Sequence, residues 1–533
     1  MEFDYVVVGG GTAGCVVAAR LSEQSEARVL LLEAGGHDRH PLIHVPGASA
    51  YTAMASALNW PRMTEPQPAL NGRALYLAQG KVIGGSSTIN GMVYTRGARG
   101  DYAEWVEAGA AGWGYDDVLP YFRKAENYSL GANDWHGANG PLQVQRGRPG
   151  LGIVDVLLDA LCEIGLPVSR DLADPDNEGV GIYDWMVGKG RRSSTARAYL
   201  HPARARPNLT VETGAHATRL IIERCRATGV DYLRDGRPAR ATAAREVILC
   251  GGALASPQLL MLSGIGPAGH LQAMDIAPLH DLPAVGANLR NHLSYQIDYR
   301  CTAPITAFQL LHAGRGAAEL FRYAFGRDGF LADGASPLGG FFRSSKRADR
   351  ADTQLFTVPL LLGGLGKGMR ALLPREHGFS LFVNQGMPHS SGAVRLRSAN
   401  PLAAPLIDPG YLSDPRDLPV LIDAVETLEP LARAEAFRRI GTKPVRPDAH
   451  NDRDSIERSI RARAGNHFHL AGTCRIGADA RDSVVDGELR LHGIAGLRVA
   501  DASVMPRMLN ANLAAPVIMI GERAADFIRS VSA

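Results

Sequence analysis

The sequence lacks the features that mark several broad classes of protein. It contains no run of about 18 or more apolar residues, which a membrane-spanning helix would need. Its net charge is only +3 and no block of like charges stands out, so no nucleic-acid partner is expected. The N-terminus, MEFD, has neither the basic start nor the apolar core of a signal peptide. A cytoplasmic location is therefore expected.

Cysteine is scarce and has no pattern. The six cysteines are Cys15, Cys162, Cys225, Cys250, Cys301 and Cys474. None of them forms a CxxC pair or has metal-ligand spacing, which predicts reduced, buried thiols and no metal site. With 533 residues, the chain exceeds one ordinary core, so two domains are expected.

The first residues carry a glycine turn between a strand and a helix. The apolar run at 5–8 is typical of a buried strand, and Gly9, Gly11 and Gly14 follow it at G-x-G-x-x-G spacing. Gly9 permits a tight turn, Gly11 lets the backbone approach a pyrophosphate, and Gly14 lets the following helix pack closely. The helix N-terminus then faces the anion.

A second apolar run, 29–32, ends in Glu33, which lies 19 residues beyond Gly14. A carboxylate at this point accepts hydrogen bonds from a ribose hydroxyl. Strand, helix, second strand and acid together predict dinucleotide binding, with a plain glycine-rich loop as the alternative. The pattern does not separate FAD from NAD.

Further along, GKVIGGSSTINGMVYTRG (80–97) contains the small and hydroxyl residues Gly84, Gly85, Ser86 and Ser87. Such a turn can lie against a flat or phosphorylated ligand, although alone it would be interpreted as a linker. Helices are predicted at 116–127 and 153–165, and strands at 209–211, 218–222 and 247–249.

Several blocks together resemble the glucose-methanol-choline (GMC) oxidoreductases, flavoproteins that oxidise alcohols. GKVIGGSSTIN resembles the first family signature and GALASPQLLMLSGIG (252–266) the second. VGANLRNHL (285–293), PLIDPGYLSDPRD (405–417) and three C-terminal blocks follow in the family's order.

The resemblance implies an α/β fold: a doubly wound, Rossmann-like FAD-binding domain interleaved with a mixed-sheet substrate-binding domain. By this similarity the FAD-binding domain comprises 1–105, 195–295 and 472–533, and the substrate-binding domain 106–194 and 296–471. Some members of the family attach their flavin covalently through a His, and in this sequence Ile89 occupies that position. The FAD is therefore expected to be non-covalent.

The resemblance also implies a set of cofactor contacts. They are Gly9, Gly11, Thr12, Ala13 and Gly14 at the pyrophosphate, Glu33 and Ala34 at the ribose, Ala217 near the adenine, Gly84, Gly85, Ser86, Ser87, Asn90, Gly91 and Met92 on the flavin side, and Asp501, Ala502, Asn512 and Val517 near the ribityl chain and flavin.

Oxidising an alcohol with a flavin removes the hydroxyl proton and sends a hydride from the same carbon to flavin N5. A neutral imidazole suits the proton, and a second donor can hold the oxygen as charge develops. In HFHLAGTC, the family pattern H-x-x-G-T puts His469, and not His467, in the position of the base. Asn512, in NAN, matches the second active-site position and cannot titrate, so it is expected to position the oxygen.

The substrate is a small-molecule alcohol that the sequence does not identify. Trp185, Phe356 and Met387 lie on candidate pocket strands but are predicted to be core residues. No carboxylate–aromatic pattern favours a quaternary ammonium group, so choline is not favoured. The segment 359–374 is interpreted either as a lid or as a surface that packs on a partner subunit or a membrane.

The electron acceptor is expected to be of the quinone type, which makes the protein a dehydrogenase. An oxygen-reducing alcohol oxidase is the alternative. A lyase or photodecarboxylase on the same fold, a flavin-binding module without turnover and an NAD-dependent dehydrogenase are further, weaker alternatives.

Overall fold

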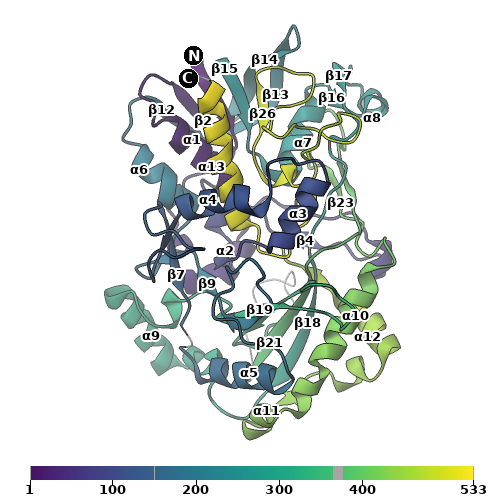
Figure 1. Ribbon diagram of the computed structural model, residues 1–533. Coiled ribbons are helices and arrows are strands. Elements are labelled where there is room, and N and C mark those ends of the chain that lie inside the picture. The colour runs from purple at the N-terminus through teal and green to yellow at the C-terminus, as the bar shows by residue number, and fades with distance from the viewer. Residues whose placement is uncertain (1, 149, 364–375, 532–533) are drawn as a thin grey trace.

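The computed structural model describes residues 2–148, 150–363 and 376–531, and it is built around two seven-stranded sheets. In Figure 1 the first sheet lies in the upper half, beside both chain ends, and the second lies in the lower half. The question of a lid or an interface at 359–374 concerns residues that mostly lie outside the described ones.

The first sheet combines parallel and antiparallel strands. Its order is β12 (Leu209–Thr213), β2 (Val29–Glu33), β1 (Glu2–Val8), β15 (Arg237–Leu249), β14 (Arg226–Arg234) and β13 (Ala215–Glu223), and β26 (Leu497–Val499) also pairs with β15. Pairing is parallel from β12 to β15 and at β26, and antiparallel among β13, β14 and β15. All five residues of β2 are buried, as expected of a central parallel strand.

The second sheet has the order β24 (Lys443–Pro444), β18 (Leu293–Arg300), β21 (Gly378–Gln385), β20 (Thr353–Val358), β19 (Leu338–Phe342) and β8 (Gly179–Ile182), and β25 (Gly465–Asn466) also pairs with β18. Every register in this sheet is antiparallel, whereas the first sheet and a smaller four-stranded sheet combine parallel and antiparallel pairs. Between β19 and β20 the chain has no helix, and a parallel pair would need such a crossover.

The helices surround these sheets. Their bounds are α1 (Thr12–Leu21), α2 (Ser49–Met54), α3 (Arg99–Glu107), α4 (Tyr115–Ala125), α5 (Gly152–Glu163), α6 (His201–Ala203), α7 (Gly252–Leu262), α8 (Ala268–Ala273), α9 (Ala313–Gly326), α10 (Asp417–Leu428), α11 (Glu435–Arg439), α12 (Arg453–Arg463) and α13 (Ala514–Val531). Helices α1 and α13 pack on each other beside the first sheet, whereas α5, α10, α11 and α12 lie around the second (Figure 1).

A third, four-stranded sheet is separate from the two large ones. It has the order β5 (Val93–Tyr94), β9 (Asp184–Trp185), β7 (Leu142–Arg146) and β6 (Glu126–Tyr128). Trp185 on β9 is fully buried and donates a hydrogen bond to the carbonyl of Ser336, which confirms its predicted core position.

Two expectations about the surface can be compared with this fold. Within the described residues, no helix has both the length and the apolar character required to cross a bilayer. All six cysteines are free, but Cys162 and Cys225 are exposed, so the prediction of buried thiols is wrong for these two. Both exposed thiols lie outside the hydrophobic cores, Cys162 near the end of α5 and Cys225 in the turn between β13 and β14.

Candidate active site

The opening glycines form a turn with no room for a side chain at Gly9 or Gly14. Gly9 has φ +104°, and a Cβ there would lie 2.5 Å from the carbonyl oxygen of Cys250. A Cβ on Gly14 would lie 1.9 Å from the carbonyl oxygen of Gly9, so the helix α1 can approach β1 only because this residue is glycine. At Gly11 the nearest atom would be 3.7 Å away, which leaves its backbone accessible from the cavity.

The second glycine turn lies directly against the first. Gly84 and Gly85 both have positive φ, and a Cβ on Gly85 would lie 2.7 Å from Cα of Gly11. Ser87 closes this turn, because its hydroxyl donates to the Gly84 carbonyl oxygen at 2.7 Å and lies 3.1 Å from the Thr195 hydroxyl. The two glycine segments, far apart in sequence, therefore form one continuous cradle.

Glu33 ends β2 at the same edge of the sheet. Its carboxylate accepts hydrogen bonds from the backbone N–H groups of Gly10, at 2.9 Å, and Gly35, at 2.7 Å. Burial raises the pKa of this carboxyl to about 7, against the opposing effect of both hydrogen bonds. A carboxylate oxygen has more than one acceptor position, so Glu33 can still receive a ligand hydroxyl.

A single cavity of about 520 Å³ joins the cradle to the candidate catalytic residues. The predicted residues that line it are Gly9, Gly11, Thr12, Ala13, Glu33, Ala34, Gly85, Ser86, Ser87, Asn90, Gly91, Met92, Ala217, His469, Asp501, Ala502, Asn512 and Val517. Gly14 and Gly84 do not line it and lie behind its wall. Ile89 lines it as a buried apolar side chain.

His469 is held by two neighbours from a distant part of the chain. Its backbone N–H donates to the Asn291 side-chain oxygen at 2.8 Å, and its Nδ1 lies 2.8 Å from Nδ1 of His292. His292 is fully buried, and its Nε2 lies 2.9 Å from the Gly386 carbonyl oxygen and 3.0 Å from that of Leu509.

These contacts fix the tautomers of both rings. Because two carbonyl oxygens can only accept, Nε2 of His292 must carry a proton and donate it to them. In the neutral ring, Nδ1 of His292 is then an acceptor, so Nδ1 of His469 is the donor in the contact between the rings. Nε2 of His469 is then unprotonated, and its lone pair is the acceptor position of the ring.

Burial keeps both rings neutral. It lowers the pKa of His469 well below its ordinary value, and the nearby His292 and His467 rings lower it further. Burial also lowers the pKa of His292 to about 4, although hydrogen bonds to the Gly386 and Leu509 carbonyls oppose this shift. A neutral His469 is the form that a general base requires before the reaction.

Asn512 contacts His469 at the ring nitrogen that does not contact His292. Its Nδ2 lies 3.4 Å from His469 Nε2. Its Oδ1 accepts hydrogen bonds from the Thr95 hydroxyl, at 3.2 Å, and from Gln354 Nε2, at 3.0 Å. With the oxygen occupied by two donors, the NH₂ group of Asn512 is the part directed at His469.

His467, two residues before His469, also lines the cavity but has different neighbours. Its Nδ1 accepts a hydrogen bond from Asn384 Nδ2 at 2.9 Å. Its ring centroid lies 4.9 Å from that of Phe356 and 5.6 Å from that of Phe382.

Two other residues on candidate pocket strands can be compared with the cavity. Phe356 is buried as predicted, but it also lines the cavity. Met387 does not line the cavity.

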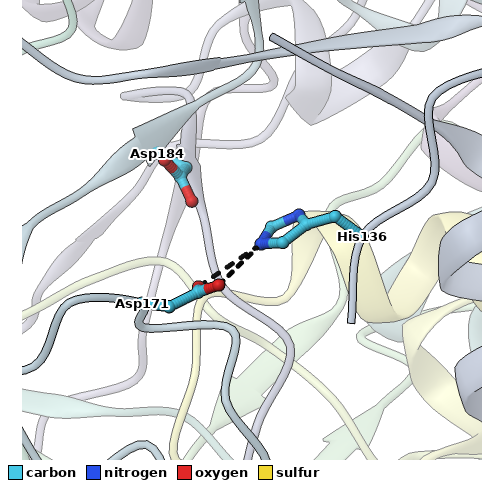
Figure 2. Close-up of side chains that lie close together, drawn as sticks. All are labelled: His136, Asp171 and Asp184. Atoms are coloured by element: carbon cyan, nitrogen blue, oxygen red, sulfur yellow. Dashed lines mark hydrogen bonds and ion pairs between the residues drawn. The ribbon is translucent and has the colours of Figure 1, made fainter. Parts of the chain in front are cut away.

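Outside this cavity, His136, Asp171 and Asp184 lie close enough together to offer three metal-ligand atoms (Figure 2). Hydrogen bonds and ion pairs already account for them. His136 Nε2 lies 3.1 Å from Asp171 and its Nδ1 lies 2.9 Å from Glu126, while Asp184 pairs with Arg146 at 3.4 Å. Burial lowers the pKa of His136, but its bonds to Asp171 and Glu126 outweigh this, so the net shift is upward. The cluster is a buried ion-pair network.

Sequence reasoning missed the residues that orient the candidate catalytic residues His469 and Asn512. His292 lies in the VGANLRNHL block, which contributed to the family resemblance but received no role. Thr95 and Gln354 carry no motif that would single them out. Their roles depend on contacts between residues that are 158 to 417 positions apart in the chain.

Comparison with known proteins gives consistent matches over nearly the whole chain. Two family profiles described as GMC oxidoreductase match residues 3–294 and 388–521. An oxygen-dependent choline dehydrogenase of Escherichia coli O157:H7 is 40% identical over 541 residues, covering 100% of this chain and 95% of that protein. A structure of Aspergillus oryzae RIB40 formate oxidase, concerned with FAD modification, has a TM-score of 0.93 and 27% identity and covers 99% of this chain and 98% of its own. Pyridoxine 4-oxidase from Mesorbium loti has a TM-score of 0.87 and 30% identity, with 98% of each chain covered.

Proposed function

The chain belongs to the GMC oxidoreductase family, and we propose that His469 is the general base and Asn512 the oxygen-binding residue of its reaction. It is an FAD-dependent oxidoreductase that acts on CH–OH groups. The observation that carries the two residue roles is the contact of 3.4 Å between His469 Nε2 and Asn512 Nδ2 inside the cavity.

The residues of the cradle fit FAD. Side chains would collide with backbone at Gly9, Gly14 and Gly85, whereas Gly91 and Gly252 border the cavity with nothing within 4 Å of an added Cβ. Backbone therefore forms much of the wall, as close approach to a pyrophosphate and a flat ring requires. We propose that the predicted cofactor contacts that line the cavity, a set that does not include His469, bind the FAD, with Gly14 and Gly84 shaping the wall from behind.

In this proposal the two side chains act on one oxygen atom. The alcohol oxygen would lie between the two groups and replace their mutual contact, and the unprotonated His469 Nε2 takes the hydroxyl proton. The Asn512 NH₂ group donates to the same oxygen, and this hydrogen bond strengthens as negative charge develops. FAD, when bound, would accept the hydride that leaves the carbon of the alcohol.

The experiment that tests this function is anaerobic addition of a panel of alcohols to the purified holoenzyme. Loss of the visible absorbance of oxidised flavin, with formation of an aldehyde or ketone, is the expected result. If no alcohol bleaches the flavin, the proposed function is wrong for this chain.

Asn512→Ala is expected to lower the rate constant of flavin reduction by about 10–10³-fold, because one hydrogen-bond donor to a developing oxyanion is lost. Asn512→His, which restores a donor, should recover part of the rate. Rapid-mixing absorbance under anaerobic conditions measures both. An unchanged rate constant in Asn512→Ala would contradict the role given to this residue.

Acid precipitation is expected to release the FAD into the supernatant. The position at which some family members attach the flavin is Ile89 here, and an alkyl side chain cannot form that bond. The measurement is flavin absorbance in the supernatant and pellet after precipitation. Flavin that stays with the protein pellet would contradict a non-covalent cofactor.

The remaining predictions are proposed with one change. We keep the domain division given above but end the second FAD-binding segment before Leu293 and not at residue 295. The reason is that β18, a strand of the second sheet, begins at Leu293. A quinone-type acceptor and a cytoplasmic location stay predictions from the sequence. The substrates named for the three relatives are choline, formate and pyridoxine, so these names do not identify the alcohol.

A further inference from the structure

One face of the second sheet forms the wall of the cavity opposite the cofactor cradle. Strands β20 and β21 pair so that Gln354 lies beside Asn384 and Phe356 beside Phe382. Alternate residues of a strand share a face, so these four side chains lie on the same side of the sheet. Gln354 reaches Asn512, which shows that this side faces the catalytic pair.

The part of this face that meets the substrate space is aromatic. Phe356, Phe382 and His467 line the cavity, and the two phenyl rings lie 4.9 and 5.6 Å from the His467 ring, centroid to centroid. We call these three residues the aromatic wall. Because Nδ1 of His467 accepts from Asn384, its proton is on Nε2, and the ring offers an N–H donor and no acceptor. Burial lowers the pKa of His467 to about 3, so the ring remains neutral.

Carboxylates that border the cavity already have partners. Those among the described lining residues are Glu33, Asp333 and Asp501. Glu33 accepts from two backbone N–H groups, and Asp501 from the Gly252 N–H and the Ser256 hydroxyl. Asp333 pairs with Arg148 at 2.9 Å.

One further carboxylate lies on this face of the sheet. Asp298 on β18 shares the face, but its carboxylate pairs with Arg446 and accepts from Ser380 and Gln296. Among the residues that the structure describes, every carboxylate at the cavity or on this sheet face therefore already has a partner. A cation beside the aromatic wall would leave water without an unpaired carboxylate from these residues to receive it.

We propose that this site selects uncharged alcohols with an apolar body and discriminates against alcohols that carry a quaternary ammonium group. The proposal rests on the function proposed above and specifies its substrate class. Removing a fixed cation from water without a counter-ion is costly, and the faces of two Phe rings compensate for only part of that cost. An apolar group of the same shape loses nothing by leaving water and fills the same space.

Choline and 3,3-dimethylbutan-1-ol form a matched pair of probes, because they differ mainly by a charged nitrogen in place of a carbon. The second-order rate constant of anaerobic flavin reduction is measured for both with the holoenzyme, alongside hexan-1-ol and benzyl alcohol. At least one neutral alcohol is expected to exceed choline by about 100-fold or more, since choline would lose its hydration without a paired charge. The neutral isostere should also exceed choline.

Each outcome of this comparison has a separate meaning. If choline reduces the flavin as fast as or faster than its isostere, the substrate inference is wrong while the proposed function stands. If none of the alcohols reduces the flavin, the proposed function itself fails, and the inference that depends on it fails too.

Phe382→Ala tests the aromatic wall directly. It should raise the alcohol concentration at half-saturation for 3,3-dimethylbutan-1-ol by about 10-fold, because the apolar contact surface is lost. The limiting rate constant should change much less. Phe325→Ala is the matched control, because Phe325 is 78% exposed on α9 and does not line the cavity. Equal half-saturation in both variants, with FAD fully bound, would overturn the role of the wall.

Discussion

His469→Ala is expected to lower the rate constant of flavin reduction by about 10²–10⁴-fold, the usual contribution of a positioned general base. FAD should stay bound, because the side chain and backbone N–H of His469 bond to Asn512, His292 and the Asn291 side chain, which lie outside the glycine turns. The measurement is anaerobic rapid-mixing absorbance, with the flavin content of each preparation determined first.

His467→Ala is the matched control for this prediction. It removes an imidazole from the same cavity, but that ring bonds to Asn384 and packs on Phe356 and Phe382. Because His467 belongs to the aromatic wall, its loss should raise the alcohol concentration at half-saturation. The limiting rate constant of this variant at saturating alcohol should fall far less than that of His469→Ala. If His467→Ala abolishes flavin reduction and His469→Ala does not, the base has been assigned to the wrong histidine.

Gly14→Ala is expected to abolish FAD binding. The added methyl group would lie 1.9 Å from the Gly9 carbonyl oxygen, so α1 must move away from β1 and the cradle must open. Gly9 has little space to move, because a Cβ built on it would lie 2.5 Å from the Cys250 carbonyl oxygen. The visible flavin absorbance per mole of purified protein gives the result directly.

Gly269→Ala serves as the control for that substitution. Gly269 lies in α8, and an added Cβ there would have nothing within 4 Å. This variant should bind a full equivalent of FAD and be equally or slightly more stable, because alanine has a higher helix propensity than glycine. A full equivalent of FAD in Gly14→Ala would show that the close packing of helix and strand is not required.

The glycine cradle could be predicted from the sequence because its signal is local. Gly9, Gly11 and Gly14 lie within six residues of one another, and Glu33 follows at the end of the next strand. Strand, turn and helix are determined by neighbouring residues, so spacing alone indicates the geometry. The family resemblance then identified the cofactor, which the spacing could not.

The orientation of the two residues proposed to be catalytic, His469 and Asn512, could not be predicted in this way. The tautomer of His469 depends on His292, 177 positions earlier, and through it on the carbonyls of Gly386 and Leu509. Backbone carbonyls leave no signal in a sequence. Asn512 likewise depends on Thr95, 417 positions away. The sequence predicts Phe356 as a core residue only. An apolar strand residue that packs inward and one that borders a cavity occupy the same kind of position in the sequence, so the two cannot be distinguished there.

The most direct test of the central claim is to mix the holoenzyme anaerobically with 3,3-dimethylbutan-1-ol that carries deuterium at both carbinol positions, and to follow flavin absorbance and product together. We predict that the absorbance of oxidised flavin is lost, that one aldehyde forms per FAD, and that this aldehyde keeps one of its two deuterium atoms. Flavin that stays oxidised with this alcohol and also with deuterated hexan-1-ol and benzyl alcohol, or that loses its absorbance without forming aldehyde, would contradict oxidation of an alcohol at this site.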